Sequence, residues 1–142
     1  MKSNSKPHLQ LSKRLTRALT LTFLALSLAG CGPSDDMKKF VVSGSITMPD
    51  GKPVPAGEIN FEPDGQAGNK GPASMTQISG GKYSLPSANG VVGGKYIVTI
   101  MPYDGVAFGE SIQGKPLVKA PYVENIDLPN ENTTKDFVVK TK

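Results

Sequence analysis

The chain has 142 residues, a formal net charge of +4 and one cysteine. This length suits one domain of ordinary size. The charge is unevenly distributed, since residues 1–30 contain five basic residues and no acidic one, whereas residues 32–142 contain eleven lysines, no arginine and twelve acidic residues. The longer part therefore lacks the clustered basic surface that nucleic-acid binding requires, and we expect no nucleic-acid partner.

The first 30 residues have the successive zones of a secretory signal peptide. A cationic stretch, 1–17, precedes an apolar stretch, 18–30, which ends in small residues. A helix over the apolar stretch would span about 20 Å, which is short of the roughly 30 Å of a bilayer core. We therefore expect residues 1–30 to be a signal peptide that is removed, and not a permanent membrane span.

The only cysteine, Cys31, follows this apolar stretch directly. Together with Leu28, Ala29 and Gly30 it resembles the lipobox of bacterial lipoproteins. The resemblance implies that signal peptidase recognises Leu28, Ala29 and Gly30, that the chain is cleaved before Cys31, and that Cys31 is acylated. A diacylglyceryl cysteine carries the two chains that stable anchoring needs. The alternative is a free or buried cysteine that happens to follow an apolar run.

The lipobox also predicts where the protein is located. It implies an exported protein that is anchored to a bacterial membrane by the lipid on Cys31. The next residue is Gly32, whereas an aspartate there retains lipoproteins at the inner membrane in some bacteria. This difference favours the outer membrane over the inner one. Residues 31–39 are rich in Gly, Pro, Ser and charge, so we expect a lipidated cysteine followed by a flexible tether.

Alternating apolar and polar residues predict short strands in the domain that follows, 40–142. The first two strands are expected at 40–48 and 57–63. Between them, Asp50 and Gly51 form a strong hairpin signal because both positions tolerate a positive φ. The apolar side chains expected to face the core from these two strands are Phe40, Val42, Ile46, Met48, Ile59 and Phe61.

Two similar stretches, GGKYSL and GGKYIV, begin at Gly80 and Gly93. Each predicts a glycine turn, a solvated lysine and a tyrosine that points into the core, namely Tyr83 and Tyr96. Further strands are expected at 73–79, at 95–101 with apolar residues on both faces, and at 134–140 with Phe137 and Val139 inward. Residues 102–116 form the longest irregular stretch, and 120–133 stay ambiguous.

The domain is therefore expected to be all-β. No helical period of useful length follows residue 31, and glycines and prolines lie between the apolar runs. About seven short strands over this length suit a single antiparallel β-sandwich.

Residues 41–101 resemble the carboxypeptidase regulatory-like domain, which implies a transthyretin-like (prealbumin-like) sandwich. Gly80 and Gly93 stand where that family usually has Asp and Pro. The motifs are turn glycines and core tyrosines, so the resemblance implies a fold and no activity. The matching positions are Gly44, Asp50, Gly51, Pro53, Val54, Gly57, Gly81, Lys82, Tyr83, Gly94, Lys95 and Tyr96.

The residue inventory argues against an enzyme. The only histidine, His8, lies in the segment that we expect to be removed. No arginine occurs after residue 17. A nucleophile paired with histidine and a histidine zinc site are therefore not expected, and we expect no cofactor and no metal. Transthyretin-like hydrolases of a purine-derived substrate rely on His and Arg and end in a Tyr-Arg-Gly-Ser-like tail, which the ending VVKTK does not resemble.

Two functions stay open. In the first, the domain is a non-enzymatic structural or protein-interaction module of the cell envelope. In the second, it binds a glycan, because sugar sites combine aromatic side chains with carboxylates, and Tyr122 follows a loop that holds such groups. The alternative is that these aromatic side chains cover the end of the core. The candidate ligand residues in the loop are Tyr103, Asp104, Phe108 and Glu110.

Overall fold

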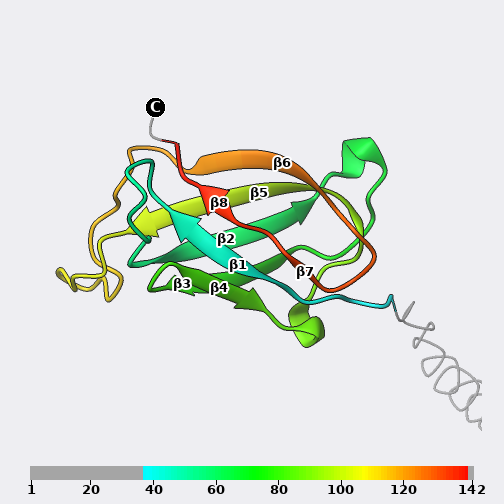
Figure 1. Cartoon of the computed structure of the whole chain (residues 1–142), viewed down its shortest axis with the longest axis horizontal. Coiled ribbons are helices and arrows are strands. Elements are labelled where there is room, and N and C mark those ends of the chain that lie inside the picture. The colour runs from blue at the N-terminus through cyan, green and yellow to red at the C-terminus, as the bar shows by residue number, and fades with distance from the viewer. Residues whose placement is uncertain (1–36, 141–142) are drawn as a thin grey trace, which may run out of the picture. The chain divides into compact units, whose positions relative to one another are not determined.

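The computed structural model of the chain describes residues 37–140 (Figure 1). They form eight strands and two short 3-10 helices, η2 (Gly65–Ala67) and η3 (Ser87–Asn89), with no α-helix among them. None of their helices is long and apolar enough to cross a membrane. The all-β prediction is confirmed. The strands are β1 (Val42–Thr47), β2 (Ala56–Pro63), β3 (Ser74–Ser79), β4 (Lys82–Leu85), β5 (Gly94–Tyr103), β6 (Tyr122–Leu128), β7 (Thr133–Thr134) and β8 (Phe137–Val138).

The predicted signal peptide, the lipobox at 28–31 with Cys31, and residues 32–36 of the predicted tether lie outside the described residues. The cleavage and acylation of the chain therefore stay predictions.

The strands form one sheet of mixed direction. Its order is β6-β5-β2-β3-β4-β1-β7, and β8 also pairs with β1. Neighbours from β6 to β1 are antiparallel, but β7 and β8 run parallel to β1. The prediction of purely antiparallel pairing is wrong at β1, because the chain crosses from β6 at one end of the order to β7 at the other and then runs in the direction of β1.

The sheet is strongly curled. Figure 1 shows β1 lying in front of β2, although β3 and β4 separate the two strands in the sheet order. Side chains of β1 and β2 belong to the same buried cluster, so the two strands face each other across the core. The shape is that of a half-barrel, and the two-sheet sandwich stays a prediction.

The core lies inside this curl and follows the predicted alternation. Ile59 and Phe61 of β2 are fully buried, while Glu58, Asn60 and Glu62 between and beside them are not. Tyr83 and Tyr96 are buried as expected, and so are Phe137 and Val139 near the end of the chain. Each such side chain stabilises the fold by about 1.5–3 kcal/mol when it leaves water, so burial of apolar residues can hold this domain together.

The turn at Asp50 and Gly51 forms, but it does not join two paired strands as predicted. Gly51 has φ 82°, and its N–H donates to the carbonyl of Met48 over 2.9 Å. The hairpin then ends after the bridge between Thr47 and Pro53. The N–H of Val54 still donates to the carbonyl of Ile46, but the N–H of Ile46 donates to the carbonyl of Gly81 over 2.8 Å, so the local ladder stops there. β2 joins the sheet beside β3 and β5 instead.

Candidate functional site

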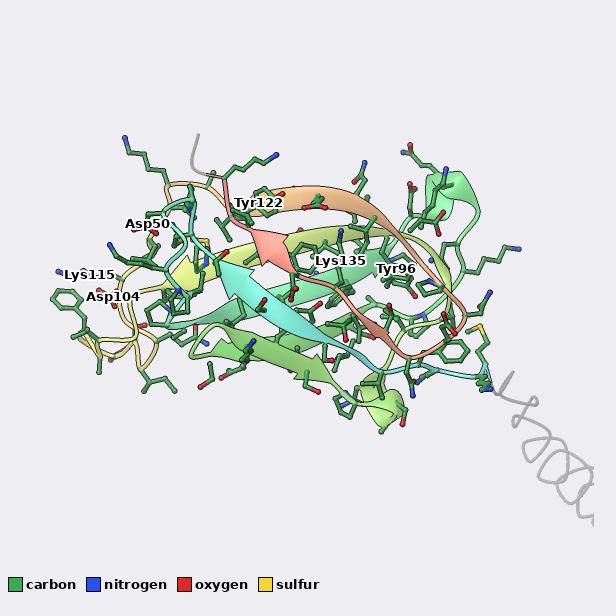
Figure 2. The ribbon with its side chains drawn as sticks, in the orientation of Figure 1. Asp50, Tyr96, Asp104, Lys115, Tyr122 and Lys135 are labelled. Carbon is green, nitrogen blue, oxygen red and sulfur yellow. The ribbon has the colours of Figure 1, made fainter. Side chains whose placement is uncertain are left out.

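The four residues proposed from the sequence as ligand contacts are Tyr103 at the end of β5 and Asp104, Phe108 and Glu110 in the loop between β5 and β6. Asp104 organises this loop, because its Oδ1 accepts hydrogen bonds from the N–H groups of Val106 (2.9 Å) and Lys115 (3.0 Å). These two hydrogen bonds lower the pKa of Asp104 below its ordinary value, and the one from Val106 has the larger effect. Figure 2 shows Asp104 and Lys115 together at the end of the sheet opposite Tyr96.

The other candidate residues do not converge with Asp104. Phe108 lies at the loop tip with 63% of its surface exposed, and the Nζ of Lys115 lies 4.2 Å from its ring centroid. Tyr103 ends β5 and is half-buried, whereas Glu110 is exposed. Within residues 37–140, no hydrogen bond or ion pair joins Glu110 to the other three. The alternative that the aromatic side chains cover the core holds for Tyr122, which packs on it, but not for Phe108.

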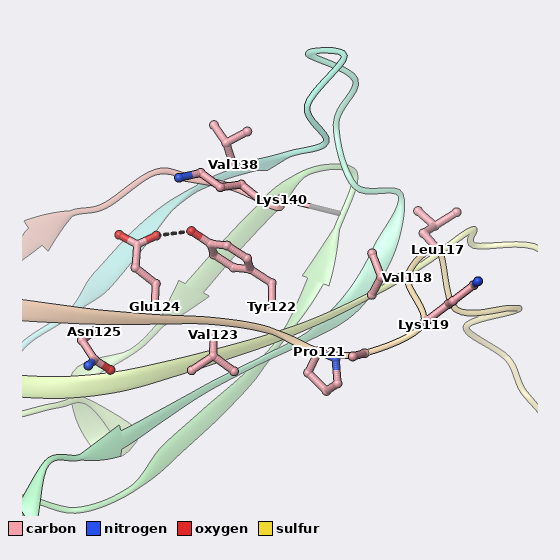
Figure 3. Close-up of a pocket in the computed structure, with 11 residues that line it drawn as sticks. Leu117, Val118, Lys119, Pro121, Tyr122, Val123, Glu124, Asn125, Val138 and Lys140 are labelled. Carbon is pink, nitrogen blue, oxygen red and sulfur yellow. Dashed lines mark hydrogen bonds between the residues drawn. The ribbon is translucent and has the colours of Figure 1, made fainter. Parts of the chain in front are cut away.

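A groove of about 940 Å³ lies between β6 and β8 (Figure 3). Of the candidate ligand residues and the neighbouring Tyr122 named from the sequence, only Tyr122 lines it. It occupies the opening of the curled sheet. β6 is the strand at one end of the sheet order, and β8 pairs with β1 near the other end of that order. The groove is lined by Leu117, Val118, Lys119, Ala120, Pro121, Tyr122, Val123, Glu124, Asn125, Val138 and Lys140.

One carboxylate links the two sides of this opening. The hydroxyl of Tyr122 donates to Oε2 of Glu124 over 2.6 Å, and the Nζ of Lys135 lies 3.5 Å from Oε1 of the same group. The hydrogen bond to Glu124 and, to a smaller extent, burial of the hydroxyl raise the pKa of Tyr122 to about 12. Tyr122 and Glu124 belong to β6, whereas Lys135 lies between β7 and β8 (Figures 2 and 3). These side chains therefore hold the edge of β6 next to the last segment of the chain.

The remaining groove surface is apolar and basic. Val123 is 56% exposed and Val138 is 49% exposed. Lys119 and Lys140 are exposed, and neither forms an ion pair with a described residue. Because Glu124 already faces Lys135, these two lysines supply the uncompensated charge of the groove. The arrangement suits a ligand that offers apolar side chains and a negative charge.

A second, smaller hollow of about 470 Å³ lies between the Asp50 turn and the β5–β6 loop. Pro53, Pro55 and Leu117 line it together with Asp104, and Asp50 forms a 2.8 Å ion pair with Lys52 at its rim. Both partners of this ion pair are exposed, so solvent screens their attraction and the pair contributes little to stability.

Neither hollow has the composition of a metal centre. No group of three or more His, Cys, Asp or Glu side chains that could hold a metal ion occurs in the part of the chain that the structure describes.

Comparison of the whole chain with protein-family models, with curated proteins and with solved structures finds no match. The resemblances to bacterial lipoproteins and to the carboxypeptidase regulatory-like domain therefore rest on the sequence motifs alone.

Proposed function

We propose that the chain is a non-enzymatic, lipid-anchored protein of the bacterial envelope, and that its β domain binds another envelope protein through the groove beside β6. The cationic and apolar zones before Cys31 support export and acylation. Two acyl chains on Cys31 would hold the protein at a membrane without a basic surface patch.

The observation that carries the binding role is the groove itself. Its volume of about 940 Å³ lies within the range of small-molecule pockets, about 300–1,000 Å³, so it can receive side chains of a partner. Its lining offers apolar surface, two lysines and one carboxylate that is engaged with Tyr122 and Lys135. Glu124 favours the neutral form of the Tyr122 hydroxyl, so this hydroxyl is a poor nucleophile at neutral pH. Such a lining suits recognition of a partner better than covalent chemistry.

Site-specific photo-cross-linking in intact cells tests this function. A photoreactive residue replaces Asn125, which is exposed and lines the groove, and in a control variant it replaces Gln77, which is exposed on β3. We expect a discrete protein adduct from position 125 and none from position 77, identified by mass spectrometry. Equal adducts from both positions, or none from position 125, would contradict the proposed binding surface.

Glycan binding is the second candidate function, and the exposed ring of Phe108 is the observation that favours it. A sugar ring can stack on such an aromatic face. The test is retention of the protein on isolated envelope polysaccharide after Phe108→Ala, with Val106→Ala as a control because Val106 is similarly exposed on this loop. Loss of retention in the first variant alone, at unchanged melting temperature, would support a glycan site.

A further inference from the structure

Among the described residues, 37–140, no strand pairs with the outer edge of β6. β6 is the last strand of the order, and its ladder to β5 uses one edge only. Within residues 37–140, no backbone hydrogen bond joins its other edge to another element. An edge of this kind presents unpaired N–H and C=O groups that can pair with an additional strand.

The groove lies along this free edge and extends to β8. Its lining includes Tyr122, Val123, Glu124 and Asn125 from β6, and Val138 from β8. Tyr122 and Glu124 lie on one face of β6, since side chains two residues apart in a strand point the same way. A strand laid beside β6 would therefore meet both free backbone groups and the apolar lining of the groove (Figure 3).

We propose that the groove receives an extended apolar segment of a partner protein, which adds a strand to β6 and places an acidic side chain against Lys119 and Lys140. This inference rests on the proposed function and names the chemistry of the partner. Backbone pairing supplies affinity in strand addition, while side-chain pockets and charges supply specificity.

Charge complementarity identifies the acidic character of the segment. Lys119 and Lys140 line the groove without an ion pair to a described residue, while Glu124 is engaged by Lys135. Acidic side chains on the bound segment would compensate the charge of these two lysines.

A second copy of β6 suits this edge poorly. β6 carries Glu124 and Asp127 and no lysine, so pairing two copies would bring four carboxylates to one pair of strands. Like charges on paired strands are destabilising. The partner segment is therefore expected to be a different sequence.

The test uses a random library of nonapeptides, acetylated and amidated at their ends, and the full chain tagged after Lys142. We expect enriched peptides to alternate apolar residues and to carry Asp or Glu toward one end. The double variant Lys119→Glu, Lys140→Glu should weaken these peptides on the order of ten-fold or more, because two attractions become repulsions. The control variant Lys39→Glu, Lys70→Glu changes the net charge equally at exposed lysines outside the groove and should leave binding unchanged.

N-methylation of an enriched peptide tests the backbone pairing. A strand added to β6 uses the N–H groups of one edge, so methylation of alternate residues in one register should weaken binding by at least about ten-fold. Methylation in the other register should be tolerated. Equal losses in both registers would overturn strand addition.

Other outcomes separate this inference from the proposed function. A protein cross-linked at position 125, with no peptide enriched, would leave the proposed function standing and overturn the extended acidic segment. Enriched peptides without any cross-linked protein would support the groove chemistry and contradict the proposed role in the cell. A dimer of the full chain that depends on Lys119 and Lys140, with no peptide enriched, would assign the groove to a second copy and overturn the proposal.

Discussion

Replacing Gly44 of β1 by alanine should destabilise the fold because the last segment of the chain crosses this glycine closely. An added Cβ would overlap the carbonyl oxygen of Lys135 and would lie 2.7 Å from its carbonyl carbon and 3.1 Å from Cε1 of Tyr83. The Lys135 backbone is fixed on both sides. Its N–H donates to the carbonyl of Ser43 over 2.8 Å, and its carbonyl accepts the hydroxyl of Tyr83 over 2.7 Å.

The structure sets the size of the effect. Overpacking of this kind costs about 1–3 kcal/mol, and each hydrogen bond lost when the Lys135 backbone moves away costs about 1 kcal/mol more. We therefore expect Gly44→Ala to lower the free energy of unfolding by about 3 kcal/mol, which corresponds to a fall of roughly 12–24 °C in melting temperature for a domain of this size. Urea unfolding followed by circular dichroism measures both the free energy and the m-value.

Gly65→Ala is the matched control. Gly65 has no atom within 4 Å of an added Cβ and no positive φ, so the free energy of unfolding should change by less than about 0.5 kcal/mol. If Gly44→Ala were as mild as Gly65→Ala, the close crossing of Lys135 over β1, and with it the parallel pairing of β7 and β8, would be refuted.

Three further predictions concern pH and the membrane. The Ser45 hydroxyl and N–H each donate to Oδ1 of Asp136 over 2.6 Å, and these hydrogen bonds lower the pKa of Asp136. The ionised carboxylate therefore stabilises the fold fully above about pH 4, the ordinary pKa of Asp. This stabilisation is lost as the pH falls through the lower pKa of the folded state. Asp136→Asn should flatten the fall in unfolding free energy toward acid, and unchanged slopes would contradict this. The pKa of Tyr122 is raised from 10.0 to about 12. Its neutral hydroxyl therefore stabilises the fold fully below about pH 10 and progressively less as the pH rises through 12. Tyr122→Phe should make the alkaline decline of the unfolding free energy shallower, and the absorbance of tyrosinate at 295 nm follows the titration of Tyr122. Cys31→Ser should abolish incorporation of labelled fatty acid into the protein in growing cells, and incorporation into this variant equal to that of the parent would refute the proposed lipid anchor.

The individual strands could be predicted from the sequence because burial on one face follows a local period of two. Ile59, Phe61 and Phe137 were placed inward on this basis and are buried. The pairing of strands could not be predicted in the same way. Asp50 and Gly51 indicate that β1 pairs with the following strand, but pairing depends on residues far along the chain. The N–H of Ile46 donates to the carbonyl of Gly81, which ends the local ladder.

The groove was not predicted because its strand has a mixed pattern. In β6, the apolar Val123 is exposed while the charged Glu124 is half-buried. This is the reverse of the usual pattern, in which apolar residues face the core, so the sequence of 120–133 does not indicate which face is buried. The hydrogen bond from Tyr122 to Glu124 could have been anticipated, since the two residues share a face. The approach of Lys135 requires the crossing from β6 to β7, which no local pattern reveals.

The free edge of β6 is also limited in ways that bear on how a partner binds. Pro121 precedes the strand and Pro129 follows it, and proline ends strand pairing because it lacks an N–H. Glu124 and Asp127 add charge that discourages indiscriminate pairing between edges. An added strand can therefore pair with at most seven residues of β6, a length of roughly 23 Å. So short a contact favours modest affinity, and the proposed anchor on Cys31 would offset this by confining the domain near partners on the same membrane, which raises their effective concentration.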